Sequence, residues 1–566
     1  MRTWSCVAAL AVGMLPAMAA AYSPVTDDRL ANPEPENWLM TRGNYQGWSY
    51  SPLSDINTAN VKNLVPVWSY STGVDSGHEA PPIVNDGVMF ISAPYNKILA
   101  LDARTGDLLW EYQRELPEGF GALHNTNRGI ALHGDKVYLA AQDAKLVALD
   151  AATGEVVWES PVADWETGYY MTLAPLIVNG KVMVGVSGGE FGVRGFVQAF
   201  DAESGESAWK TYTIPGPGEP GHDTWEGDTW ERGGASVWMT GNYDPETGLT
   251  YWGTGNGSPW FGDQRPGDNL YTSSTVAIDP DTGELKGHFQ YHWNDSWDWD
   301  EMNAPIVVDF EKDGQTVKGL LKPSRNGYLY WLERTPEGPI NFVDATNYVK
   351  QDVFASIDPQ TGRPTYNDDK KPGTGKYADF CPSLWGGKDW PYEAYNPNTG
   401  MIYIPANDNH CGFLEGKVQE YVAGQWWTGV DIPDIGFTVD KDTKTFGEIQ
   451  AWDVDTGEQV WTHYYPVMNW GSILTTGGGL VFNGGTNDRY FRAFDARSGE
   501  QLWQFKTNSG IMAPPSSFEV DGVQYIAVQS GWGVDPAFQQ GLLNDLLGTD
   551  LVVPQGGVVW VFAVNQ

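Results

Sequence analysis

The sequence is poor in positive charge. Its 566 residues include only 34 Lys and Arg against 72 Asp and Glu, which gives a formal charge of −38. Such a surface repels phosphate backbones and anionic lipid, which argues against nucleic acid or a membrane surface as a partner. The acidity does not indicate disorder, because 41% of the residues are hydrophobic and only 19% are charged.

Long apolar runs are confined to the N-terminus. Residues 1–21 combine a positive charge at Arg2, an apolar run over 7–18 and small residues at 17–20. This layout is typical of a secretory signal peptide rather than a short buried helix. No later segment has the roughly 20 apolar residues of a membrane helix. We therefore expect a signal peptide over 1–21, a single exported domain over 22–566 and no membrane anchor.

Cysteine is almost absent. Of three cysteines, Cys6 lies within the expected signal peptide, which leaves Cys381 and Cys411. In an exported protein this pair favours a disulfide, with metal ligation beside His410 as the weaker alternative. No Cys-x-x-Cys-His motif occurs, so the sequence predicts no covalently attached c-type haem.

Tryptophan and glycine, by contrast, are abundant, with 27 Trp and 67 Gly. The motif Ala-x-Asp-x-x-(Thr/Ser)-Gly-x-x-x-Trp recurs, ending at Trp110, Trp158, Trp209, Trp461 and Trp503. Asp102, Asp150 and Asp201 in this motif lie 48 and 51 residues apart. Such a period is typical of four-stranded propeller blades, with Asp and Gly in a turn and Trp wedged between sheets. The repeats predict an all-β propeller of seven or eight blades.

One insertion, Tyr291–Glu301, is rich in carboxylates and indoles. If Trp297–Asp300 is extended, Asp298 and Asp300 point to one face and the two tryptophans to the other. Two carboxylates this close repel each other unless a cation lies between them or one stays protonated. The segment indicates a metal or acid–base site, with a solvated acidic strand edge as the alternative.

Two glycine-rich segments offer further oxygen ligands. Glu190 lies in Val186–Gly195 and Asn256 in Tyr251–Trp260, among glycines that let a ligand approach the backbone. Carboxylate and amide oxygens are the ligands of a hard cation such as Ca²⁺. Glycine-rich propeller turns have the same composition, so an ordinary structural role is the alternative for both segments.

Together, these motifs resemble the pyrroloquinoline quinone (PQQ)-dependent alcohol dehydrogenases, the methanol and ethanol dehydrogenase family. The resemblance covers nearly the whole mature chain and rests on the Trp repeats, Gly188–Gly195, Gly253–Asn256, Arg265–Asn269 and Trp297–Asp300. It implies an eight-bladed β-propeller with Trp docking motifs, and with PQQ and a metal ion on its axis. It also implies a periplasmic quinoprotein that oxidises primary or secondary alcohols to aldehydes or ketones and passes electrons to a soluble cytochrome c.

The same resemblance implies a role for individual residues. Asp298 becomes the general base, with Arg325 as the second catalytic residue, and the metal ligands are Glu190, Asn256, Asp298 and Asp300. Trp238 is expected to stack on the quinone, and Trp532 is a looser assignment. Arg and hydroxyl groups suit the carboxylates of PQQ. The implied PQQ-binding residues are Glu79, Arg128, Thr172, Ser187, Gly188, Gly189, Ser236, Trp238, Arg325, Asp389 and Trp532.

The chain departs from the family at one position and resembles a subgroup at another. Relatives carry two adjacent cysteines where Ala122 and Leu123 stand here, which implies a roomier, more apolar lid and a bulkier substrate. Asp300, two residues beyond the base, resembles the lanthanide-dependent members. Because one more carboxylate better neutralises a trivalent ion, we expect a lanthanide(III) ion, with Ca²⁺ as the alternative.

Two rival functions use parts of the same sequence. A non-catalytic periplasmic propeller that binds proteins would not need Glu190, Asn256, Asp298 and Arg325 around one axis. A glycoside hydrolase with an Asp298/Glu190 pair would leave Asn256 without a role. We therefore expect an enzyme, whose remaining acidic surface attracts a basic cytochrome. The loops 385–395 and 424–446 are expected to shape the substrate site.

Overall fold

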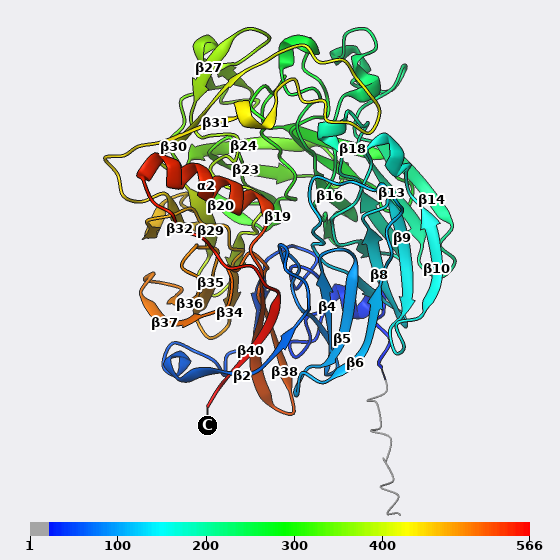
Figure 1. Ribbon diagram of the computed structural model, residues 1–566, viewed down its shortest axis with the longest axis vertical. Helices are drawn as coiled ribbons and strands as arrows, with labels where there is room; N and C mark the ends of the chain where they lie inside the picture. The colour runs from blue at the N-terminus through cyan, green and yellow to red at the C-terminus, as the bar shows by residue number, and fades with distance from the viewer. Residues whose placement is uncertain (1–21, 566) are drawn as a thin grey trace, which may run out of the picture.

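The computed structural model describes residues 22–565, so the predicted signal peptide lies outside the described residues. Those residues form eight sheets of four strands, one of which gains a fifth, and three smaller sheets. In Figure 1 the colours run around the molecule from blue through cyan, green and orange to red, so successive sheets follow one another in a ring. The expected eight-bladed all-β propeller is confirmed.

The blades follow chain order. The first four are β3 (Ile83–Asn85), β4 (Val88–Ala93), β5 (Lys97–Asp102) and β6 (Leu108–Gln113); β7 (Ala131–His133), β8 (Lys136–Ala141), β9 (Lys145–Asp150) and β10 (Val156–Pro161); β11 (Leu176–Val178), β12 (Lys181–Gly185), β13 (Phe196–Asp201) and β14 (Ser207–Tyr212); β15 (Asn242–Asp244), β16 (Leu249–Gly253), β17 (Ser274–Ile278) and β18 (Leu285–Gln290). Inner strands such as β4 are wholly buried, whereas outer strands such as β6 alternate, so the core lies between neighbouring blades.

The next three blades have the same design. They are β19 (Ile306–Val307), β22 (Gly319–Pro323), β23 (Tyr328–Arg334) and β24 (Ile340–Asn347); β28 (Ala394–Asn396), β29 (Met401–Asn407), β32 (Gly447–Asp453) and β33 (Gln459–Tyr465); β34 (Leu474–Thr476), β35 (Leu480–Asn483), β36 (Tyr490–Asp495) and β37 (Gln501–Lys506). The short strand β1 (Tyr50–Ser51) adds to β34 in parallel.

The eighth blade joins the two ends of the described chain. It contains β38 (Ser516–Val520), β39 (Val523–Ser530) and β40 (Val558–Val564), and its outer strand is β2 (Leu64–Ser71). The strands β2 and β40 pair antiparallel from Leu64↔Val564 to Ser71↔Val558. Backbone hydrogen bonds between distant segments therefore close the ring.

Tryptophan and glycine of the repeated motif meet between blades. Trp110 of β6 donates its indole N–H to the carbonyl of Ala151 at 3.0 Å, one blade further on. A Cβ atom on Gly154 would lie 2.5 Å from the Trp110 ring, so only glycine fits there. Asp150 accepts the amides of Ala152 and Thr153 at 3.0 and 2.9 Å, which forms the turn that presents Gly154. The expected roles of the motif residues are confirmed.

Insertions between strands cover one end of the ring (Figure 1). They include the pair β25 (Phe354–Ile357)–β26 (Pro364–Tyr366) and the sheet of β27 (Tyr377–Phe380), β30 (His410–Glu415) and β31 (Gly436–Val439). The pair β20 (Phe310–Lys312)–β21 (Gln315–Val317) lies at the opposite end, where Glu311 contacts Asp455 of a motif turn. The predicted disulfide Cys381–Cys411 is present and ties the residue after β27 to β30.

Two α-helices complete the described chain, α1 (Asp27–Ala31) and α2 (Val534–Leu547). In Figure 1, α2 lies across the front of the ring, in red. Neither of them is long and apolar enough to cross a bilayer.

A substitution in one turn should measure how much the packing of Trp against Gly contributes. Gly154 has φ +75° and contacts Trp110, whereas Gly522 has φ +74° and no atom within 4 Å of a built Cβ. We expect Gly154→Ala to reduce the free energy of unfolding by about 2–4 kcal/mol, from backbone strain plus the clash. Gly522→Ala should cost about 1 kcal/mol, from strain alone. Denaturant unfolding of both variants tests this, and equal losses would contradict it.

Candidate active site

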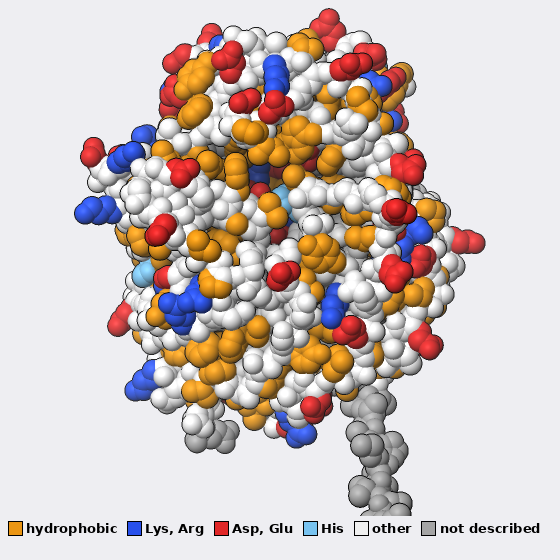
Figure 2. Space-filling model, viewed as in Figure 1, with side chains coloured by type: hydrophobic (Ala, Val, Ile, Leu, Met, Phe, Trp, Pro, Cys, Tyr) orange, Lys and Arg blue, Asp and Glu red, His pale blue; other side chains and the backbone are white. Residues whose placement is uncertain are grey.

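A cavity of about 230 Å³ lies among the insertions, and Figure 2 shows it as a hollow near the centre of this face. Its inner part is polar and buried, with Arg128, Thr172 and Ser187 all 3% exposed or less. Its outer part is apolar and more open, with Ile432 44% and Val534 52% exposed. A ligand entering this cavity would pass a mostly apolar mouth, in which Asp535 is the charged side chain, before it meets the buried polar groups.

Most of the predicted site residues line this cavity, although they come from distant segments. Glu190 lies on the short 3-10 helix η3 (Gly189–Phe191) between β12 and β13, and Trp238 precedes β15. The predicted residues that line the cavity are Arg128, Thr172, Ser187, Gly188, Glu190, Trp238, Asp298, Asp300, Arg325 and Asp389.

Several predicted residues lie behind this lining. The backbone N–H of Asn256 donates to Asp300 Oδ1 at 2.6 Å, and Glu79 Oε2 lies 2.9 Å from Arg128 Nη2. A Cβ atom built on Gly189 would lie 3.3 Å from Ser236 Oγ and 3.6 Å from Asn256 Oδ1, which places these three residues together. Trp532 does not line the cavity: it is buried in an apolar cluster with Trp470 and Met512.

The carboxylates of the inner cavity lack sufficient compensation. Burial, with Asp300 nearby, raises the pKa of Asp298 well above its ordinary value. Burial raises the pKa of Asp300 to about 7 and that of Glu190 above its usual range. Among the described residues, Asp298 Oδ1 is buried without a hydrogen-bond partner. A bound cation would remove this repulsion and restore the charged forms.

The inner cavity also offers positive charge. The Nε atoms of Arg128 and Arg325 are buried with no hydrogen-bond partner in the part of the chain that the structure describes. The Arg128 guanidinium lies 4.6 Å from the centre of the Trp238 ring. These groups suit a flat, anionic ligand, while the carboxylates suit a cation. Within residues 22–565, no three acidic, His or Cys side chains form a complete metal site. An ion here therefore needs further oxygen ligands, such as Asn256 or a bound cofactor. The residues fit PQQ with a metal ion.

Arg325 connects three parts of the cavity wall. Its Nη1 donates to the backbone carbonyl of Asp298 at 2.8 Å and lies 3.9 Å from Asp300 Oδ2, while Nη2 donates to Asp389. Burial opposes the charge, but Asp389, Asp300 and Asp298 outweigh it and keep the pKa of Arg325 above its ordinary value. Arg325 therefore stays positively charged.

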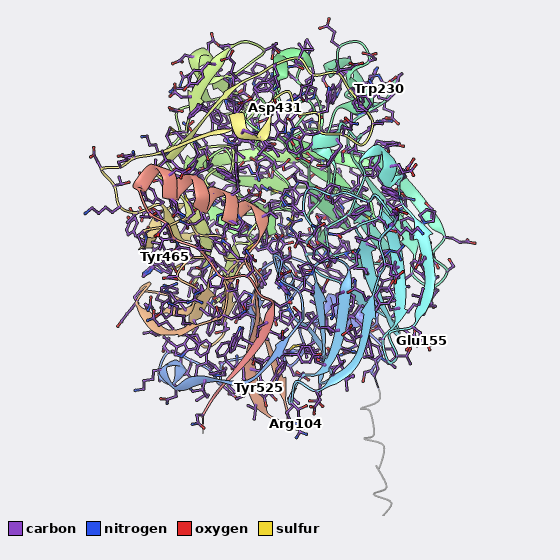
Figure 3. All side chains as sticks on the ribbon, in the orientation of Figure 1. Arg104, Glu155, Trp230, Asp431, Tyr465 and Tyr525 are labelled. Carbon is purple, nitrogen blue, oxygen red and sulfur yellow. A yellow bond between two sulfur atoms is a disulfide. The ribbon has the colours of Figure 1, made fainter. Side chains whose placement is uncertain are left out.

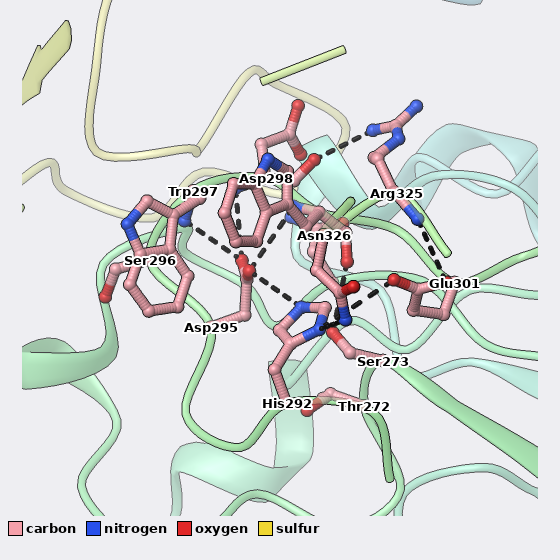
Figure 4. Close-up of polar contacts among 12 residues, drawn as sticks. Thr272, Ser273, His292, Asp295, Ser296, Trp297, Asp298, Glu301, Arg325 and Asn326 are labelled. Atoms are coloured by element: carbon pink, nitrogen blue, oxygen red, sulfur yellow. Dashed lines mark hydrogen bonds and ion pairs between the residues drawn. The ribbon is translucent and has the colours of Figure 1, made fainter. Parts of the chain in front are cut away.

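The extended conformation considered for Trp297–Asp300 does not occur. The segment is an irregular loop, and Asp298 has a left-handed backbone with φ +63°. Figure 4 shows the reason: the side chain of Asp295 accepts the amides of the following residues and holds the chain in a turn. The predicted division of side chains still holds. The rings of Trp297 and Trp299 stack in the core with their centroids 5.0 Å apart, while the carboxylates of Asp298 and Asp300 line the cavity.

Most residues of the outer, apolar part of the cavity, which we call the apolar mouth, were not predicted from the sequence. Helix α2 contributes Val534, Asp535 and Phe538, and the flanking glycines Gly533 and Gly548 were a usable helix signal. Asp431, labelled in Figure 3, adjoins Ile432 on the segment facing α2. Both loops expected to shape the substrate site reach the cavity. Loop 385–395 contributes Trp385 and Asp389, and loop 424–446 contributes Trp426, Ile432 and Ile435. Other lining residues are Leu123, His124, Tyr170, Trp260 and Leu384.

Known proteins share this architecture. The PQQ family model "Glucose/ethanol/alcohol dehydrogenase, beta-propeller domain" matches residues 38–361 and 465–526. Quinoprotein alcohol dehydrogenase PedH of Pseudomonas putida is 38% identical, over 98% of this chain and 95% of its own. Quinoprotein ethanol dehydrogenase of Pseudomonas aeruginosa is 36% identical, over 98% of this chain and 95% of its own.

Solved structures agree. A europium-containing methanol dehydrogenase superposes with a TM-score of 0.88 at 34% identity, covering 95% of this chain and all of its own. Quinohemoprotein alcohol dehydrogenase of Comamonas testosteroni superposes with a TM-score of 0.86 at 35% identity, covering 95% of this chain and 82% of its own.

Adding a cation should stabilise the folded protein, because it relieves the repulsion among Glu190, Asp298 and Asp300. At a free ion concentration of 100 Kd, the gain is about 2.7 kcal/mol. Thermal unfolding of the chelator-treated protein, with and without La³⁺ or Ca²⁺, measures this gain. KCl at matched ionic strength is the control, and no increase in Tm with either cation would contradict the expectation.

Proposed function

This chain belongs to the PQQ-dependent alcohol dehydrogenase family, and from that premise we propose which residues perform its chemistry. Its activity is the oxidation of alcohols with PQQ and a metal ion, and the non-catalytic scaffold is not favoured. The observation that carries the assignment is the buried Asp298 carboxylate, which faces the cavity with Oδ1 free of hydrogen bonds.

The polar inner cavity is proposed to hold the cofactor. Arg128 and Arg325 would pair with the carboxylates of PQQ, Thr172 and Ser187 would add hydroxyl groups, and Trp238 would supply a flat apolar face. Glu79, Gly188, Gly189, Ser236 and Asp389 complete the proposed set, in which Trp532 contributes only through the packing behind the wall. When bound, PQQ supplies a quinone that accepts two electrons from the alcohol carbon.

Glu190, Asn256, Asp298 and Asp300 are the proposed metal ligands. Their oxygen atoms match the preference of hard cations, and three carboxylates balance a trivalent charge. The structural relative that contains europium supports a lanthanide(III) ion, with Ca²⁺ as the alternative. Asp300 also accepts the backbone N–H of Asn256 through Oδ1 and, at 3.1 Å, the indole N–H of Trp238 through Oδ2. It therefore links two other members of the proposed site.

Asp298 is the proposed general base. Its free Oδ1 would accept the proton of the substrate hydroxyl, and a cation beside it would keep it ionised. Arg325 would hold the Asp298 backbone in place through its carbonyl and add positive charge to the reacting end of the cavity. The apolar mouth would exclude water and receive the hydrocarbon part of a primary or secondary alcohol.

The acidic surface, with a formal charge of −38, supports a basic, soluble cytochrome c as the electron acceptor. The signal-like residues 1–21 support cleavage before residue 22, action in the periplasm and a mature propeller domain over 22–566.

Asp298→Asn should lower kcat by at least about 10³-fold while PQQ stays bound, because the amide cannot accept the hydroxyl proton. Dye-linked alcohol oxidation gives the rate, and the absorbance of the dialysed protein gives the bound PQQ. Asp150→Asn, in a distant turn, is the matched control. Turnover above a tenth of the normal rate would rule out this role.

Asp300→Ser should shift the metal preference towards Ca²⁺. Removal of one carboxylate weakens binding of a trivalent ion more than of a divalent one, so the ratio of La³⁺- to Ca²⁺-supported activity should fall about tenfold or more. Asp300→Asn removes the charge at constant size, but its single acceptor oxygen can serve only one of the two N–H donors, Asn256 and Trp238, which bond different oxygens of Asp300. Comparison with Asp300→Ser therefore shows whether one retained hydrogen bond matters once the charge is gone. An unchanged ratio in both variants would contradict a lanthanide site.

A further inference from the structure

The backbone of Asp298 is held in an unfavourable conformation. Its φ of +63° is left-handed, which costs a residue with a Cβ atom about 1–2 kcal/mol. The loop around it has no strand or helix to enforce this geometry. Neighbouring groups must therefore hold the residue, and those groups decide where its carboxylate points.

Asp295 provides most of this support. Its Oδ2 accepts the amides of Trp297 and Asp298 at 3.3 and 3.1 Å. Its Oδ1 accepts the amide of Trp299 at 3.3 Å and lies 3.1 Å from His292 Nε2. Figure 4 shows the carboxylate beneath the loop, facing these donors. Four partners match the acceptor capacity of one ionised carboxylate.

Asp295 is itself fixed in the core. Its side chain and that of His292 are fully buried, and His292 lies 3.8 Å from Glu301 Oε1 through its other ring nitrogen. Arg265, also fully buried, donates to the backbone carbonyl of Asp295 and, at 2.9 Å, to that of Trp260. The support is therefore anchored to the segment that carries Asn256.

We propose that Asp295 is a positioning residue that, with Arg325, clamps the peptide unit of Asp298 from both sides and aims its carboxylate into the cavity. Asp295 holds the Asp298 amide, and Arg325 holds the Asp298 carbonyl at 2.8 Å. This inference rests on the proposed role of Asp298 as base and metal ligand. Asp295 does not line the cavity, so it acts only through Asp298.

An asparagine at position 295 would break the clamp without changing its size. The amide has one acceptor oxygen, and its NH₂ group would face N–H donors that now meet a carboxylate oxygen. Residues that orient metal ligands in this way typically contribute 10–100-fold to affinity or activity. The apolar mouth would be untouched, so the effect should fall on kcat and metal affinity rather than on KM.

The test compares Asp295→Asn with Asp201→Asn. Asp201 accepts the amides of Glu203 and Ser204 at 3.1 and 2.8 Å, but in an exposed blade turn. In the holoenzyme we expect Asp295→Asn to lower kcat for ethanol 10–100-fold, with KM changed less than threefold. Tryptophan-sensitised Tb³⁺ luminescence of the metal-free, full-length protein should show a 10–100-fold higher Kd. Asp201→Asn should leave all three quantities unchanged.

The proposal would be overturned if Asp295→Asn had the same kcat and the same Tb³⁺ Kd as Asp201→Asn. If Asp295→Asn does not fold, His292→Phe removes one of the four partners, and a loss of about threefold or more in both quantities is then required. Asp298→Asn in parallel separates the two levels of inference. If that variant keeps turning over, the proposed base is wrong, whereas an inactive Asp298→Asn beside a normal Asp295→Asn refutes the positioning role alone.

Discussion

The contact between a tryptophan of one blade and a glycine of the next supports the rest of this structure. The indole of Trp110 covers Gly154 and bonds the carbonyl of Ala151, and the same contact joins Trp461 to Gly499. Because each contact sets the distance and tilt between neighbouring sheets, the loops at one end of the ring are brought around a common centre. Residues far apart in the chain, such as Arg128 and Asp389, can then line one cavity.

Within that cavity, opposite charges are kept apart by a few ångströms and left partly unpaired. Arg325 pairs with Asp389, but Asp298 Oδ1 and the Nε atoms of Arg128 and Arg325 have no hydrogen-bond partner in the described chain. A site that satisfied every group internally would have little to offer a ligand. This incomplete pairing leaves charged groups available to a charged cofactor and a cation.

The sequence predicted the features that depend on repetition or local chemistry. The motif at Asp150 and Gly154 predicted blades, and the pair Cys381 and Cys411 predicted a disulfide. The prediction failed where a single side chain rearranged the backbone, as Asp295 does at residues 297–299. It also failed for α2, whose place over the cavity depends on packing between distant segments, although Gly533 and Gly548 mark its ends.

Closure of the ring by β2 and β40 has a consequence for how the protein is made. The strand that completes the eighth blade, β40, is the last strand of the described chain, while its partner β2 starts at Leu64. A growing chain can assemble the other blades in order, yet its first long strand has no neighbour until the last segment has emerged. Ring closure therefore joins strands from opposite ends of the described chain, and removal of β40 would leave both β2 and β39 without a neighbour on that side.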